Sequence, residues 1–116
     1  MEIWHNPRCS KSRQALTLLE DAGAEPVVRR YLDEPPTAAE LDGALTALGL
    51  EPWDIARTGE ARAKELGLKD MDHDRDTWIE LMVANPILIE RPIVIAADGR
   101  AVVGRPPERV TELLDG

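Results

Sequence analysis

The sequence predicts a mixed α/β fold in which a β-α-β unit, a helical block and a β-β-α unit follow one another. Short runs rich in Val and Ile, typical of strands, occur near both ends of the chain. Apolar residues at helical spacing fill the middle, and prolines and glycines separate the segments. The length of 116 residues suits a single domain, which we expect to span residues 1–116.

The first β-α-β unit occupies the N-terminal part of the chain. Glu2–His5 is predicted as a strand that ends at Asn6-Pro7, because a residue before proline disfavours helix. A helix follows and ends at Gly23. Its apolar face is formed by Ala15, Leu16, Leu19 and Ala22. Pro26–Leu32 is predicted as a second strand, with Val27, Val28 and Tyr31 as its apolar members.

The central block is predicted to be helical. Thr37 and Glu40 have the spacing of a capping box, which starts a helix. The apolar residues of that helix are Leu41, Leu45 and Leu48. A shorter helix is expected over Glu60–Leu66, ending at Gly67. Another surrounds Trp78 and finishes before Asn85.

The C-terminal part is predicted as a hairpin followed by a helix. Ile93–Ile95 and Ala101–Gly104 form the strands, with Asp98-Gly99 at the turn. Pro106-Pro107 opens a last helix through Leu114, since proline is tolerated in the first helical turn. This order of elements matches a thioredoxin-like core with a helical insertion between its halves.

Composition excludes several classes of function. A formal charge of −8 and a pI near 4.7 argue against nucleic acid as a partner. No apolar stretch approaches the ~20 residues that span a bilayer, and the N-terminus lacks the form of a signal peptide. We therefore expect no membrane association and a cytoplasmic location. One cysteine and two scattered histidines cannot form a structural zinc site, so no metal is expected.

Cys9 lies in a basic turn where a predicted strand gives way to a helix. Residues 3–19 contain no Asp or Glu. A thiol titrates near 8.5, and shifting it by two units requires about 2.7 kcal/mol. A helix N-terminus typically supplies about 0.3–1 kcal/mol, so a cationic or hydrogen-bonding neighbour is needed. The candidates near in sequence are His5, Arg8, Lys11 and Arg13. The alternative is an inert buried cysteine.

Cys9 and Ser12 form a Cys-x-x-Ser arrangement without a second sulfur. Any covalent adduct at Cys9 must therefore be resolved by a thiol from outside the chain. A low-molecular-weight phosphatase would need arginine six residues after its cysteine, and Ala15 occupies that position. The spacing excludes that class.

Three separated segments resemble the glutaredoxin-coupled arsenate reductase family. They are His5-Asn6-Pro7-x-Cys9-x-x-Ser12-Arg13, the run Asn85–Val94, and Gly104-Arg105-Pro106-Pro107-Glu108. The resemblance implies a thioredoxin-like fold with a helical insertion. It also implies a reaction in which the cysteine attacks arsenate, a thiol attacks the arsenic–cysteine adduct, and a redoxin reduces the mixed disulfide.

The same resemblance implies roles for individual residues. Arg57, Arg91 and Arg105 correspond to the family's oxyanion-binding arginines, and His5 to its thiolate-stabilising histidine. Arg91-Pro92 would place an arginine beside the proline that is cis in thioredoxin-like proteins. Asn6 and Ser12 are expected to orient the turn around Cys9, as parts of the substrate site. Arg13 is either a neighbour of the thiolate or a charge on the helix surface.

The expected cosubstrate is glutathione or another low-molecular-weight thiol, with no bound cofactor, and the expected partner is a glutaredoxin-like redoxin. We expect a monomer. Two other functions stay open. One is a thiol reductase of the same fold that acts on glutathione-type mixed disulfides with little arsenate activity. The other is a regulator that binds RNA polymerase. Such regulators typically carry Cys-x-x-Cys and lack an arginine equivalent to Arg105, the opposite of this chain.

Overall fold

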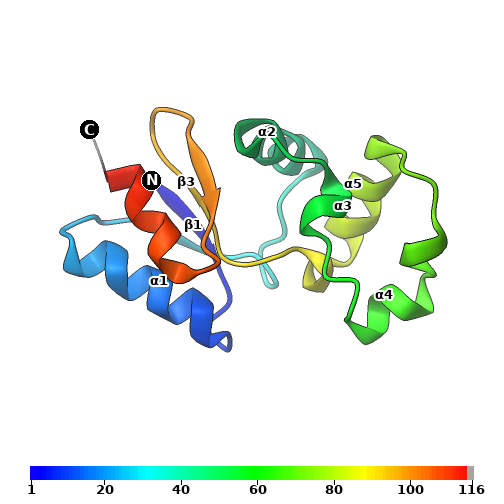
Figure 1. Ribbon diagram of the computed structural model, residues 1–116, viewed down its shortest axis with the longest axis horizontal. Coiled ribbons are helices and arrows are strands. Elements are labelled where there is room, and N and C mark those ends of the chain that lie inside the picture. Colours follow the sequence, from blue (N-terminus) through cyan, green and yellow to red (C-terminus); the bar gives the residue numbers. More distant parts are fainter. Residues whose placement is uncertain (115–116) are drawn as a thin grey trace. The chain divides into compact units, whose positions relative to one another are not determined.

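The computed structural model describes residues 1–114, which divide into two compact units (Figure 1). The first unit combines Met1–Glu34 with the chain from Arg91 onward, and the second is Pro35–Glu90. The predicted helical insertion is thus the second unit. Whether residues 1–116 behave as a single domain stays a prediction.

The first unit contains a four-stranded mixed sheet. Its strands are β1 (Glu2–His5), β2 (Val27–Arg30), β3 (Ile93–Ile95) and β4 (Ala101–Val103). The order is β2-β1-β3-β4, with β1 parallel to β2 and antiparallel to β3, and β3 antiparallel to β4. The β-α-β half and the hairpin half therefore join through β1 and β3, which confirms the predicted α/β class.

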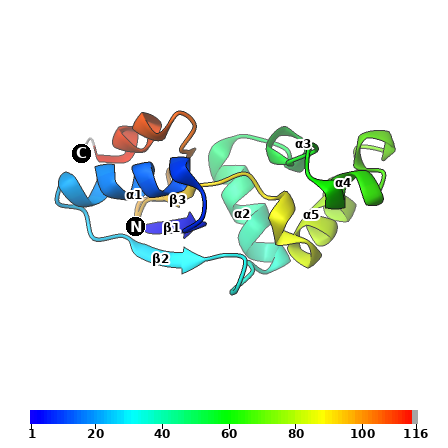
Figure 2. The ribbon, with the colours of Figure 1, turned by 90° about the horizontal axis from the view of Figure 1, so that it is seen from below.

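One face of this sheet carries an apolar core. Ile3, Val94 and Val102 are neighbours across the strands and pack against α1 (Ser10–Asp21) and the 3₁₀ helix η3 (Pro107–Leu114). The helical members of the core are Ala15, Leu19, Val110 and Leu113. Figure 2 shows α1 and η3 on the same side of the strands. Each fully buried aliphatic side chain contributes about 1.5–3 kcal/mol, and this core holds α1 against the sheet.

The sequence predicts the last helix but not that it is a 3₁₀ helix. Residues Pro107–Leu114 form a 3₁₀ helix, and the buried members are Pro107, Val110 and Leu113. A spacing of three matches the 3.0 residues per turn of a 3₁₀ helix, so all three side chains face the core. With this winding, η3 packs against α1 and β4.

The second strand is shorter and more exposed than its apolar residues indicated. Val27 and Val28 are 66% and 44% exposed, whereas Tyr31, just past the strand, is fully buried. The reason is position, because β2 lies at the edge of the sheet, next to β1. Period-two patterning cannot distinguish an edge strand from a central one.

The second unit is helical. It contains α2 (Ala38–Leu48), α3 (Pro52–Ile55), α4 (Ala61–Glu65) and α5 (Arg75–Ala84), with 3₁₀ turns η1 (Leu68–Asp70) and η2 (Pro86–Leu88). The predicted capping box of Thr37 and Glu40 is confirmed. Sequence periodicity missed α3, which is one turn long. No helix within residues 1–114 has the length and hydropathy to cross a bilayer.

Candidate active site

Cys9 is the N-cap residue of α1, directly after the turn that follows β1. Its backbone N–H donates to the carbonyl of Asn6 (3.0 Å), and its own carbonyl accepts from the N–H of Arg13 (3.0 Å). The residue is half-buried. The predicted position of the thiol at a strand-to-helix turn is therefore confirmed.

Opposing effects act on the Cys9 thiol. Burial raises its pKa, but the backbone N–H of Ser12, the Arg91 side chain and the backbone N–H of Lys11 stabilise the thiolate by hydrogen bonds. The positive charge of Arg91 adds to them, and the pKa lies below the ordinary thiol value. The N–H groups are those of the first turn of α1, and the additional cationic neighbour is Arg91, which is distant in sequence.

Two arginines meet at the sulfur. Nη2 of Arg105 lies 3.5 Å from Sγ of Cys9, and its Nε donates to the carbonyl of Arg91 (2.9 Å). The Arg91 side chain also hydrogen-bonds the sulfur, and its pKa is raised. Burial alone would lower that pKa, but the interactions with Cys9 and Tyr31 outweigh burial. Two guanidinium groups beside the sulfur therefore favour its thiolate form.

The loops that carry these arginines pack closely together. The Arg91–Pro92 and Arg105–Pro106 peptide bonds are both cis, and the N–H of Gly104 donates to the carbonyl of Pro92 (2.8 Å). A Cβ at position 104 would lie 2.8 Å from Cγ of Pro92, a distance that real Cβ atoms essentially never show. The resemblance implied a cis bond at Pro92, whereas nothing in the sequence indicated the one at Pro106.

His5, Asn6 and Ser12 form a buried network under the turn. Oγ of Ser12 lies 2.6 Å from Nδ1 of His5 and accepts from the backbone N–H of Asn6 (3.1 Å). Oδ1 of Asn6 accepts from the N–H of Arg8 (3.0 Å). These side chains therefore brace the turn, while the N–H of Ser12 contacts the sulfur. The Ser12 hydroxyl as the centre of the network was missed by sequence reasoning.

The pKa of His5 is lowered, chiefly by burial and further by the charges of Arg30 and Arg13, with Glu20 opposing. A neutral imidazole can accept the Ser12 hydroxyl hydrogen at Nδ1, which leaves the lone pairs of Oγ for the Asn6 N–H. Its described contact is with Ser12 and not with Cys9. The role of His5 in stabilising the thiolate stays a prediction, and the contacts indicate that it would act through Ser12.

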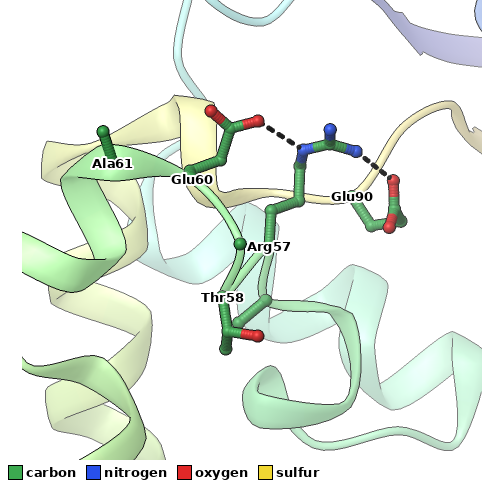
Figure 3. A pocket seen from close by; sticks show the side chains of 7 residues that line it. Arg57, Thr58, Glu60, Ala61 and Glu90 are labelled. Atoms are coloured by element: carbon green, nitrogen blue, oxygen red, sulfur yellow. Dashed lines mark hydrogen bonds and ion pairs between the residues drawn. The ribbon is translucent and has the colours of Figure 1, made fainter.

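Arg57 belongs to the second unit and is held by two carboxylates. Its Nε donates to Oε1 of Glu60 (3.1 Å) and its Nη1 to Oε1 of Glu90 (2.8 Å), as Figure 3 shows. Backbone bonds from Arg57 to Leu88 and from Glu90 to Ile55 align the two segments. Arg57, Glu60 and Glu90 line an open pocket of about 540 Å³. Neither glutamate was singled out from the sequence, and the function of Arg57 stays a prediction.

Residues 1–114 contain no group of three or more His, Cys, Asp or Glu side chains placed to hold a metal ion.

A sequence model described as the ArsC family matches residues 4–113. The chain belongs to the ArsC family. An uncharacterized protein in the glnII region of Streptomyces viridochromogenes is 54% identical over 117 residues, covering 98% of both chains. The arsenate reductase of Neisseria meningitidis serogroup A is 44% identical over 115 residues, covering 98% of this chain and 97% of that protein.

The fold agrees with this membership. The structure of an arsenate reductase from Vibrio cholerae superposes with a TM-score of 0.91 at 45% identity, covering 97% of this chain and 95% of that one. The predicted thioredoxin-like fold and the resemblance to arsenate reductases are therefore confirmed.

Proposed function

We propose that the protein reduces arsenate to arsenite, with Cys9 as the nucleophile and an external thiol as the reductant. The observation that carries the proposal is a sulfur of lowered pKa hydrogen-bonded by Arg91 and Arg105. The arsenate reductase of Neisseria meningitidis, similar over almost its whole length, supports the choice of substrate.

Arg91 and Arg105 would bind the substrate as well as the sulfur. Arsenate resembles phosphate, whose second ionisation lies near ~6, so it arrives largely as a dianion at neutral pH. Guanidinium groups stay charged and present several donors in a fork, which suits a tetrahedral oxyanion. They also reduce the repulsion between an anionic nucleophile and an anionic substrate. Arg57 remains the predicted third ligand of the oxyanion.

In the first step, the Cys9 thiolate attacks arsenic. A sulfur–arsenic bond forms, and one oxygen leaves as hydroxide, which takes a proton from solvent. Arsenic stays pentavalent in this step. The backbone N–H groups of Lys11 and Ser12 and the Arg91 side chain, which stabilise the thiolate, keep the nucleophile ionised before arsenate arrives.

In the second step, an external thiolate attacks Sγ of Cys9. The sulfur–arsenic bond breaks, its electron pair stays on arsenic, and arsenite leaves as a disulfide forms between Cys9 and the incoming thiol. The two electrons thus come from two sulfurs. Because Cys9 is the only cysteine of the chain, the second sulfur has to be external. We propose glutathione or a similar small thiol, with a glutaredoxin-like redoxin that reduces the mixed disulfide.

The test is arsenite production with glutathione and glutaredoxin, comparing the wild type with Cys9→Ser. We expect turnover by the wild type and none by the variant, whose circular dichroism spectrum should be unchanged. The absence of arsenite with every thiol tried, while Cys9 still reacts with iodoacetamide, would refute the proposal. Rapid reduction of glutathione mixed disulfides by such a preparation would favour the thiol reductase alternative.

A further inference from the structure

A groove of about 400 Å³ begins at Ser10, the residue after Cys9. We call it the α1 groove; it is lined by Ser10, Arg13, Gln14, Thr17, Leu18 and Glu108. It lies within the first unit, which also contains Cys9. Its volume is in the range of small-molecule sites, which are typically about 300–1,000 Å³.

The groove has two differently charged sides. Ser10, Arg13 and Thr17 are spaced at three and four residues along α1, so with Gln14 they form one polar stripe. Glu108 comes from the first turn of η3, which packs against α1. A cation and an anion therefore border the same groove from two elements.

Neither charge is neutralised by a neighbouring side chain. Nη1 of Arg13 donates to the carbonyl of Pro7 (2.9 Å), which ties the guanidinium group to the turn before Cys9. Within residues 1–114, Arg13 and Glu108 take part in none of the ion pairs, and both side chains are exposed. Each can therefore bind a ligand without first releasing a counter-ion.

The dimensions indicate the size of the ligand. From Ser10 to Thr17 the helix rises about 10 Å at 1.5 Å per residue. An extended peptide spans about 3.3–3.6 Å per residue, so about three residues cover this length. A ligand of that size with one carboxylate for Arg13 and one ammonium group for Glu108 would match both charges.

We propose that the α1 groove binds the external thiol: a short peptide thiol that has both a free carboxylate and a free ammonium group. The inference rests on the proposed function, which requires such a thiol, and adds where it binds and what it must carry. Bound there, the thiol would have its charged groups along α1 and its sulfur at the Ser10 end, next to Cys9.

The test uses thiol–disulfide exchange, which needs no arsenate. The Cys9 thiolate attacks one sulfur of a disulfide, the sulfur–sulfur bond breaks, and the other half leaves as a thiolate. The rate of mixed-disulfide formation is measured by mass spectrometry with two probes. Glutathione disulfide carries the carboxylates and ammonium groups, and 2-hydroxyethyl disulfide carries no charge. The readout is the rate with glutathione disulfide divided by the rate with 2-hydroxyethyl disulfide. A general change in the reactivity of Cys9 alters both rates and cancels in this ratio.

We expect Arg13→Gln and Glu108→Gln each to lower this ratio by about five- to tenfold, as for the loss of one charge-assisted hydrogen bond. Arg109→Gln is the matched control. Arg109 is an exposed arginine of η3 outside the groove, paired with Glu112, and its removal should leave the ratio unchanged. An unchanged ratio in the two groove variants, or an equal fall in the control, would overturn the inference.

Failure of the proposed function would look different. If a preparation yields no arsenite with any thiol but retains a high ratio, the proposed reduction of arsenate is refuted and the inference about the α1 groove stands. If arsenite is produced but Arg13→Gln and Glu108→Gln leave the ratio unchanged, the proposed reduction of arsenate stands and the inference about the α1 groove is refuted.

Discussion

Arg105 and Arg57 belong to different units and have opposite surroundings. Arg105 donates to the sulfur of Cys9 and to a backbone carbonyl, and the Arg91 guanidinium meets the same sulfur. Arg57 donates to the carboxylates of Glu60 and Glu90. In the first arrangement two guanidinium groups meet one sulfur, and in the second one guanidinium group meets two carboxylates.

This difference in surroundings determines how readily each arginine can bind an anionic substrate. Guanidinium groups beside a thiolate attract an oxyanion, and their N–H groups can donate hydrogen bonds to its oxygen atoms. The two carboxylates beside Arg57 offset its positive charge, so its attraction for another anion is weaker. The resemblance treated the three arginines as equivalent ligands, whereas their contacts separate Arg57 from the other two.

The comparison predicts the largest effect at Arg91. Arg91→Lys keeps a positive charge but loses the planar fork that can hold the sulfur and an oxyanion together. We expect KM for arsenate to rise by about tenfold or more, with the fold intact. Arg62→Lys is the control, since Arg62 is an exposed surface arginine paired with Glu65. Unchanged kinetics in Arg91→Lys would remove this residue from the site.

Packing around the arginines gives the next effect. Gly104→Ala would bring Cβ to 2.8 Å from Pro92 and 3.1 Å from Val110, so the loops have to separate. We expect a loss of about 1–3 kcal/mol in the free energy of unfolding, measured in urea. Gly43→Ala, in α2 with no atom within 4 Å of the new Cβ, should instead gain about 0.5–1 kcal/mol. Equal stabilities of the two variants would contradict this packing argument.

The lowered pKa of Cys9 predicts how its reactivity depends on pH. The thiolate is the reactive form, so alkylation by iodoacetamide should stay rapid as pH falls below the ordinary thiol range, down to the pKa of the folded state. The same protein in denaturant should show a midpoint near ~8.5. The pKa of Cys9 is lower in the folded protein than in the unfolded chain, so the ionised thiolate adds to the free energy of unfolding. This contribution is fully present above the pKa of the unfolded chain and is lost as the pH falls through the pKa of the folded protein. A native midpoint at or above the denatured one would disprove the assignment.

The smallest effect is expected at the Arg57 cluster. The side chains of Arg57 and Glu90 are 22% and 26% exposed, and such a pair contributes no more than about 1 kcal/mol. Glu90→Gln should therefore change stability only slightly, as should Glu60→Gln. If releasing one carboxylate makes Arg57 available, KM for arsenate falls in Glu90→Gln by a factor of about two to three. An unchanged KM would contradict the idea that Glu90 limits the binding of arsenate by Arg57.

The sequence was enough to identify Cys9, because its basic surroundings and its turn are local features. Arg91 and Arg105 were identified only through resemblance to a family. Arg105 is 96 positions from the sulfur it contacts, and no local pattern predicts such a contact. Glu60, three residues after Arg57, has a spacing that could have been noticed, but Glu90 is 33 positions from Arg57 and could not.

The sequence by itself determined where several of the helices and strands begin or end. The capping box at Thr37, the turn at Gly67 and the hairpin across Asp98-Gly99 depend on hydrogen bonds and backbone angles within a few residues. Tertiary structure alone decided that β2 lies at an edge of the sheet and that the last helix is a 3₁₀ helix. It also decided that Arg91 and Arg105 contact the sulfur of Cys9, whereas Arg57 contacts carboxylates. These outcomes depend on which distant segments pack together, and attraction between charges acts through space, whatever their separation along the chain.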